Sequence, residues 1–463
     1  MTPSLCFVTC FDLAPLQHAI AQNLDARGIT TRFVASNSAW LGYLRDQGVP
    51  ADHILDISKL PSRQELGAED VAEALAEIAE AEALVEFRLH RILQVDPFLR
   101  DAPTATGHRW AAFMWREMKA FFDDHHTTHV LGEPSSLPDI IAYLLMVRRS
   151  GQYIAPRDMR YPHGRTIFFG DPFQRELLPV QLDDSPPQDP STANTDAPSA
   201  GSPSYSALPR ARRITDATHV RAALRNRLMR RAGKRGDYSF RPLSRQARTI
   251  ALRLLRKRTE RRHLNARVEG YARKATFPLH VQPEAAIDVE ATWFRNQVEM
   301  VRWFRSALPA DMLLEVREHP ASLGKRSLAE LRAIKRIPGV RLVGPNTPMK
   351  TAIEESDLVL TILGTAAWEA ALLGTPTIIL VNNYFASLDG IFPCGAPTQL
   401  PQTIQQALAW QPNPETNQAH LETMLKRSTV GHWCDVVSKP YVTQADNVNR
   451  LADAVQRLVQ APS

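Results

Sequence analysis

The chain has 463 residues, of which 44% are hydrophobic and 22% charged, with a formal net charge of +6 at neutral pH. This length is too great for one ordinary core and suits two domains of a globular protein. Its four cysteines have no metal-ligand spacing, and the first residues lack the basic flank of a secretory signal, so we expect reduced thiols and a cytoplasmic protein.

The first part of the chain alternates between short apolar runs and helical patterns. Residues 5–11 and 30–36 are predicted strands on either side of a helix that ends at Gly28. A β–α–β opening of this spacing is typical of a parallel sheet. Further helices are predicted over 69–94, 109–123 and 137–151, and the strand that begins at residue 128 leads into a loop at Glu133. Residues 1–182 are therefore predicted to form an N-terminal Rossmann-like domain.

Two unusual segments follow this domain. Residues 183–209 are dominated by Pro, Ser, Asp and Ala, a composition that cannot bury enough apolar surface to order itself, so a disordered linker is predicted. Residues 210–274 contain 22 Lys and Arg against 4 Asp and Glu, and 210–275 is predicted to be a basic helical insertion. Ile250, Leu254 and Leu255 form a narrow apolar stripe on it.

The basic insertion has alternative interpretations. A solvated charged helix is one, and an interfacial helix on an anionic membrane surface, through residues 210–270, is the other. Nucleic-acid binding is not expected, because few aromatic residues are interleaved with the basic ones.

The β–α alternation resumes near Thr276. Strands are predicted at 276–281, 312–317, 340–343, 357–363 and 375–381, with helices at 290–308, 327–336, 348–356 and 365–374. We predict a second Rossmann-like domain over 276–440 and a separate C-terminal helix within 441–463. The predicted fold class is α/β, with two doubly wound domains.

The stretch DLVLTILGTAAWEAALLGTPTIILV, residues 357–381, is nearly all apolar and is long enough to cross a bilayer. However, Glu369 lies at its centre, and Gly364, Gly374 and Pro376 divide it as in a strand–helix–strand unit. We interpret it as a buried β–α–β unit.

Polar residues follow two strands of the predicted second domain. His319 and Pro320 come directly after one strand, and Gly364 and Thr365 lie between another strand and a helix. Because ligands of open parallel sheets bind beyond the carboxyl ends of the strands, these loops are candidates for an anion site. Glu369 lies one helical turn beyond Thr365 and could accept hydrogen bonds from a sugar diol. Taken singly, each feature is as typical of a turn, of close packing or of a helix surface.

No metal site is predicted. The chain contains no D-x-D triplet, and His125 and His129, although spaced i, i+4, fall where a helix ends and a strand begins. We expect neither a metal nor another cofactor.

The segments PLHVQPEAA, EVREHPAS and TILGTAAWEAALLGTP occur in this order and resemble the capsule polysaccharide biosynthesis family, which includes the Kdo transferases of capsule assembly. GEPSS and RYPHGRTIFF also fit that family, so that the resemblance covers roughly residues 125–172 and 276–385. It implies a GT-B-like fold and a glycosyltransferase that uses a nucleotide sugar, most plausibly CMP-activated. One difference is Thr375, where family members often have Lys.

The resemblance implies that His319, with Pro320 beside it, and the loop of Gly364 and Thr365 hold the nucleotide phosphate. A carboxylate of the N-terminal, acceptor-binding domain would be the general base. Glu133, just past a strand, is the first candidate, and Asp12, also at a strand end, is the second. Glu284 is a candidate for binding donor or acceptor.

Two alternatives remain open at this point: a UDP-sugar 2-epimerase on the same fold, and a non-catalytic scaffold of capsule assembly. The expected partners of a transferase are a nucleotide sugar, a lipid-linked or oligosaccharide acceptor and an anionic membrane surface. The expected location is cytoplasmic, peripheral at the inner face of the membrane.

Overall fold

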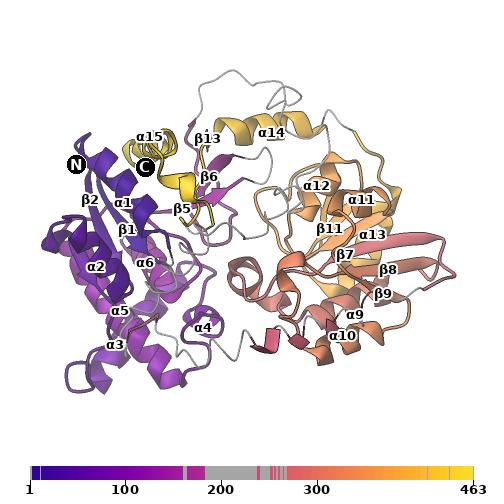
Figure 1. Ribbon diagram of the computed structural model, residues 1–463, viewed down its shortest axis with the longest axis horizontal. Coiled ribbons are helices and arrows are strands. Elements are labelled where there is room, and N and C mark those ends of the chain that lie inside the picture. Colours follow the sequence, from indigo (N-terminus) through magenta and orange to yellow (C-terminus); the bar gives the residue numbers. More distant parts are fainter. Residues whose placement is uncertain are drawn as a thin grey trace. The chain divides into compact units, whose positions relative to one another are not determined.

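A computed structural model describes residues 3–10, 12–159, 164–182, 237–239, 251–253, 255–256, 259–260, 264, 268–413, 416–436 and 438–461. They form two units (Figure 1), which are described separately below. The described residues of unit 1 lie within 1–186, 213–241 and 424–463, and those of unit 2 within 242–423. The predicted linker 183–209 and most of the basic insertion lie outside the described residues.

Unit 1 is built on one sheet whose strand order is β13-β6-β5-β4-β1-β2-β3. The strands from β5 to β3 are parallel, whereas β6 pairs antiparallel with both β5 and β13. The strands are β1 (Ser4–Thr9), β2 (Thr30–Ala35), β3 (Ile54–Asp56), β4 (His129–Leu131), β5 (Gln152–Asp158), β6 (Arg165–Phe169) and β13 (Ser428–Val430).

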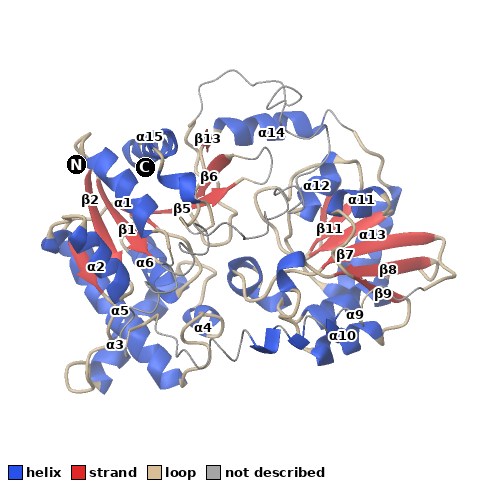
Figure 2. Cartoon of the chain, viewed as in Figure 1, coloured by secondary structure: helices blue, strands red, loops and turns tan. Residues whose placement is uncertain are grey.

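Helices alternate with these strands, as Figure 2 shows. Asn37 begins one of them by accepting a hydrogen bond from the Trp40 amide, and Gly28, at a φ of +80°, follows the end of another. The helices are α1 (Ala14–Asp25), α2 (Ser38–Asp46), α3 (Ala68–Ala83), α4 (Leu89–Leu93), α5 (Thr104–Asp124), α6 (Leu137–Arg148) and α15 (Ala445–Gln460).

The C-terminal part of the chain returns to unit 1. Strand β13 pairs with β6, and α15 buries Leu451, Val455 and Leu458 in the same apolar cluster as Leu16 and Ile20 of α1. Each such side chain contributes about 1.5–3 kcal/mol when fully buried. The structure thus groups residues from Met424 onward with unit 1. The sequence pattern instead predicts that residues up to 440 belong to the second domain and that 441–463 form a separate helix.

Unit 2 has a parallel sheet in the order β12-β11-β10-β7-β8-β9. Its strands are β7 (Arg273–Pro278), β8 (Met312–Arg317), β9 (Val340–Val343), β10 (Leu358–Thr361), β11 (Thr377–Ile379) and β12 (Ile391–Pro393). Its helices are α9 (Gln297–Ala307), α10 (Leu328–Lys335), α11 (Met349–Glu354), α12 (Ala366–Leu372) and α13 (Leu400–Ala409), and α14 (Thr416–Lys426) follows.

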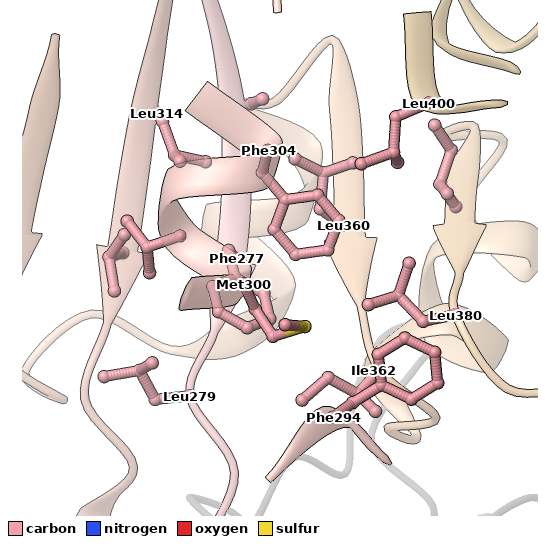
Figure 3. Packing of buried hydrophobic residues seen from close by; sticks show 14 of the residues in the cluster. Phe277, Leu279, Phe294, Met300, Phe304, Leu314, Leu360, Ile362, Leu380 and Leu400 are labelled. Carbon is pink, nitrogen blue, oxygen red and sulfur yellow. The ribbon is translucent and has the colours of Figure 1, made fainter. Parts of the chain in front are cut away.

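The core of unit 2 lies between this sheet and its helices. Phe304 of α9 and Leu400 of α13 pack with Phe277 of β7 and Leu360 of β10 (Figure 3), and all four are completely buried. The stretch 357–381 supplies β10, α12 and β11, which confirms its interpretation as a buried β–α–β unit. Within the described residues, no helix is both long enough and apolar enough to span a membrane.

One predicted helix is broken. Residues 290–308 were expected to be continuous, but a π-helical turn (Ala286–Glu290) and a 3₁₀ turn (Thr292–Phe294) precede α9. The reason is local: Asn296 caps α9 by accepting from the Glu299 amide, and the Thr292 hydroxyl donates to the Asp288 carbonyl.

Two units in one chain, one on a parallel sheet and one on a mostly parallel sheet, confirm the predicted two-domain α/β fold with doubly wound sheets. In each sheet the strands that follow the first one are added on one side of it, and the later strands are then added on its other side. The strand order therefore reverses beside β1 in unit 1 and beside β7 in unit 2, and such reversals are where open α/β sheets bind ligands.

Candidate functional site

In unit 2 the reversal brings together the loops that follow β7 and β10. His280 comes just after β7, and its Nε2 lies 3.1 Å from Oγ1 of Thr361, the last residue of β10. The same hydroxyl oxygen accepts the Gly364 amide at 3.1 Å. Burial, reinforced by Arg326 and His319, lowers the pKa of His280 to about 3, so the ring is neutral at physiological pH.

Gly364 is required by this close approach. A Cβ at this position would lie 2.8 Å from Thr361 Oγ1 and 2.9 Å from His280 Cε1, distances that a real side chain does not tolerate. The turn after β10 is therefore packed directly against the imidazole of His280.

His319 lies on the neighbouring loop, after β8, and is half-buried. Its amide donates to Glu318 Oε1 at 2.7 Å, and its Nδ1 accepts the Ala321 amide at 3.0 Å. Because Nδ1 is an acceptor, Nε2 carries the ring proton. Pro320 begins the short 3₁₀ turn that supplies this arrangement.

A buried ion pair joins the two histidine loops. Arg326 Nε lies 2.7 Å from Glu318 Oε2, and Arg326 Nη2 donates to the His280 carbonyl at 2.5 Å. Burial raises the pKa of Glu318 to about 7, against the opposing effect of Arg326. Glu318 thus binds the backbone amide of His319, and its ion-pair partner Arg326 binds the backbone carbonyl of His280.

The described helical residues of the basic segment contact this region. The Gly324 amide donates to the buried carboxyl of Glu260 at 2.5 Å. Arg253 lies within hydrogen-bond reach of the carbonyls of Ala321 and Leu323, at 3.4 Å from each.

The other predicted residues of unit 2 lie on or just before α12 and in the loop after β7. Thr365 is half-buried and precedes α12, and its carbonyl accepts the Glu369 amide at 3.1 Å. Glu369 is half-buried on α12. Glu284 is exposed in the loop after β7, where its amide donates to Asp288 Oδ2 and its charge acts on Lys325.

Unit 1 places Asp12 and Glu133 at its own reversal, after the adjacent strands β1 and β4. Asp12 is buried, and its carbonyl accepts the Val436 amide at 3.4 Å. Glu133 Oε1 lies 3.5 Å from Arg157 Nη1. Burial raises the pKa of Glu133, which Arg157 opposes and Asp435 and Asp158 reinforce.

The returning C-terminal segment supplies further charged groups at this edge of unit 1. Lys439 Nζ donates to Asp158 Oδ2 at 2.6 Å and lies 2.8 Å from His432 Nδ1. Burial opposes ionisation of Asp158, but hydrogen bonds from His432 and Lys439 outweigh it and lower the pKa of Asp158.

Gly364 thus packs against His280, and the Glu318–Arg326 pair links the backbone of His280 to that of His319. Glu133 and Asp12 follow adjacent strands of the other sheet. Sequence reasoning missed His280, Glu318 and Arg326 in unit 2 and the Asp158–Lys439 pair in unit 1. Glu318 carried a usable signal, since it directly follows the buried strand β8. His280 did not, because the sequence pattern places it inside the predicted strand 276–281, whereas β7 ends at Pro278.

No protein-family model matches the chain, and no curated protein matches its sequence. Among solved structures it is similar to the UDP-GlcNAc 2-epimerase from Methanocaldococcus jannaschii, at 12% identity and a TM-score of 0.27, covering 92% of this chain and 99% of that one. It is also similar to a β-Kdo 2,7-transferase from Thermosulfurimonas dismutans, at 13% identity and a TM-score of 0.31, over 64% of this chain and 80% of that one. The chain is also similar to the UDP-N-acetylglucosamine 2-epimerase from Rickettsia bellii, at 9% identity and a TM-score of 0.30, covering 98% of this chain and 99% of that one. We draw no functional argument from likenesses of this size.

Proposed function

We propose that the protein is a glycosyltransferase that moves a sugar from a nucleotide-activated donor, CMP-activated and Kdo-like, to a lipid-linked or glycan acceptor of a surface polysaccharide. The observation that carries the proposal is the cluster of His280, His319 and Gly364 at the strand-order reversal of unit 2. There a neutral imidazole, an Nε2–H donor and a glycine turn lie in loops that follow the carboxyl ends of the strands, where open α/β sheets bind ligands.

In this proposal His319 stabilises the leaving phosphate. Its Nε2–H is oriented by the Nδ1 contact with the Ala321 amide before any ligand arrives, and a preorganised donor is most effective where negative charge develops in the transition state. The Thr365 hydroxyl adds a second donor beside Gly364. Glu369 and Glu284 are proposed to bind hydroxyl groups of the sugars.

Glu133 is the proposed base for the acceptor hydroxyl, with Asp12 as the second candidate. A general base works best when its pKa lies near the working pH, and burial moves the pKa of Glu133 upward in that direction. The ionised form is needed, so between acid and neutral pH the transfer rate should rise as this carboxyl loses its proton.

The donor proposal is tested by thermal unfolding with CMP, UDP, GDP and ADP in turn. At 100 times Kd a specific ligand contributes about 2.7 kcal/mol of stability, so CMP should give the largest rise in Tm. A larger rise with UDP would contradict the choice of donor. Incubation with a nucleotide sugar and no acceptor separates the alternatives, because an epimerase forms product there and a transferase does not.

We also propose that the basic segment, residues 210–270, tethers the protein to an anionic membrane surface. Each basic residue close to such a surface contributes about 1 kcal/mol, and the effect decays over roughly 8 Å at physiological salt. Deleting the whole segment would also remove Tyr238 and Glu260, which are buried in the folded units. The sharper variant therefore changes Arg to Gln at positions 221, 225, 227, 230 and 231.

Flotation with liposomes should show binding to anionic vesicles that weakens at high salt and falls in this variant. Equal binding to neutral and anionic vesicles, or no binding to either, would refute the tether.

A further inference from the structure

A second carboxyl, Asp139, is buried beside Glu133 at the strand-order reversal of unit 1. It lies in the first turn of α6, is fully buried, and forms no ion pair with a cation among the described residues. The titratable groups that face it come from each neighbouring element. They are Cys10 after β1, Glu133 after β4 and Tyr153 of β5, with Asp96 bound to the Leu137 amide at the start of α6.

The hydrogen bonds around Asp139 leave room for one more proton. Ser136 Oγ lies 2.8 Å from Asp139 Oδ2 and 3.2 Å from Cys10 Sγ, but its single hydroxyl proton can serve only one of them. If the Asp139 carboxyl is protonated on Oδ2, it donates to Ser136, and Ser136 donates to Cys10. The opposite order, in which the thiol donates to Ser136, would leave a charged carboxylate buried without a cation.

That charged state is costly. A buried carboxylate with no cationic partner takes up a proton rather than bear the loss of hydration. Burial is the largest influence on Asp139 and raises its pKa to about 8, and the charge of Glu133 acts in the same direction. Cys10 and Tyr153 do not compensate, since burial raises the pKa of each well above its ordinary value and keeps both neutral.

Asp139 also packs against the turn that presents Glu133. A Cβ on Gly132 would lie 2.6 Å from Asp139 Oδ1 and 3.1 Å from the Tyr153 hydroxyl, so the carboxyl lies directly on the backbone of this turn. The backbone amide of Glu133 faces the same carboxyl. Glu133, in contrast, has Arg157 beside it.

We propose that Asp139 is a positioning residue that holds a proton at neutral pH, so that Glu133, paired with Arg157, is the ionised carboxyl of the two. The inference rests on the proposed function only in taking Glu133 as the base. A negative charge on Asp139 would repel the carboxylate of Glu133 and so disfavour its ionised form. A neutral Asp139 avoids this repulsion and still packs against the turn of Gly132 that presents Glu133.

The first test is independent of activity. It compares the pH dependence of stability in wild type and Asp139→Asn by chemical unfolding. A carboxyl whose folded pKa is raised contributes stability below its unfolded pKa, near 4, and this contribution is lost as pH rises through the folded value. Relative to D139N, the folding equilibrium constant of wild type should fall by up to about tenfold per pH unit between roughly pH 4 and 8. Parallel curves for the two proteins would overturn the proposal.

If D139N does not fold, the protonation state of Asp139 is tested by infrared spectroscopy of a protein that keeps Asp139 and carries only the change Glu318→Gln. The Glu318→Gln background removes one other buried carboxyl, whose pKa is raised to about 7. Burial also raises the pKa of Asp96, Glu133 and Glu260, which remain. The band is therefore followed through about pH 8, where Asp139 is expected to lose its proton. The band of a protonated carboxyl should persist at neutral pH and disappear above about pH 8. Its absence at neutral pH would mean that Asp139 is charged.

Transfer assays complete the design. D139N should keep the neutral-pH rate and retain activity at alkaline pH where wild type loses it, whereas Asp139→Ala should lose rate at every pH. A D139N variant that loses activity at neutral pH although it folds would count against the positioning role. If Glu133→Gln keeps full activity while the stability and infrared results hold, the proposed base is wrong but the protonated state of Asp139 stands.

Discussion

Replacing Gly364 by Ala tests whether the turn after β10 has to lie directly against His280. The added methyl would meet Thr361 Oγ1 at 2.8 Å and His280 Cε1 at 2.9 Å. Neither group can move freely, because the Thr361 oxygen accepts the Gly364 amide and the backbone of His280 is held by Gln297 and Arg326. Overpacking of this kind typically costs about 1–3 kcal/mol.

Given the size of unit 2, we expect its Tm to fall by roughly 2–4 °C for each kcal/mol of unfolding free energy that is lost. Nucleotide affinity should fall as well, because either His280 or the turn of Gly364 has to shift. Differential scanning calorimetry and a nucleotide titration measure the two effects. The matched control is Gly395→Ala, also in unit 2, where a Cβ would meet nothing within 4 Å and where the loss of backbone freedom in the unfolded chain makes the change neutral or slightly stabilising.

If G364A has the stability and nucleotide affinity of G395A, the close packing of this turn is not needed and the proposed phosphate site loses its main support. If only stability falls and the folded fraction binds nucleotide normally, the glycine is a packing requirement alone.

Three further changes probe other parts of the structure. His319→Ala should lower the transfer rate by about 10²–10³-fold with unchanged Tm, measured by steady-state kinetics, because a phosphate-stabilising donor is lost from a loop; near-normal activity in the folded variant would remove His319 from the site. Tyr238→Phe should destabilise unit 1 by about 1–3 kcal/mol in urea unfolding, because the buried carboxyl of Asp96 loses the donated hydroxyl; an unchanged midpoint would contradict this. Lys439→Met should lower stability above about pH 4 and approach wild type at lower pH, since the lowered pKa of Asp158 means that its stabilising charge is lost as pH falls; a constant difference across pH would show that the pair does not act through charge.

The alternation of strands and helices was predictable because each element carries its own pattern. Runs such as LCFVT and MLLEV are buried on both faces and read as strands of a parallel sheet, and Gly28 marked the end of the first helix from local backbone chemistry. The same local logic placed His319 and Gly364 after strands, where sheets of this kind bind ligands.

The tertiary structure alone decided which of these loops meet. The approach of His280 to Gly364 depends on β7 pairing with β10, which lie about 80 residues apart in sequence, and no local pattern records such a pairing. The return of β13 and α15 to unit 1 is decided in the same way. An amphipathic helix shows that it must bury one face, but which surface covers that face follows from the total apolar area that the folded chain can remove from water.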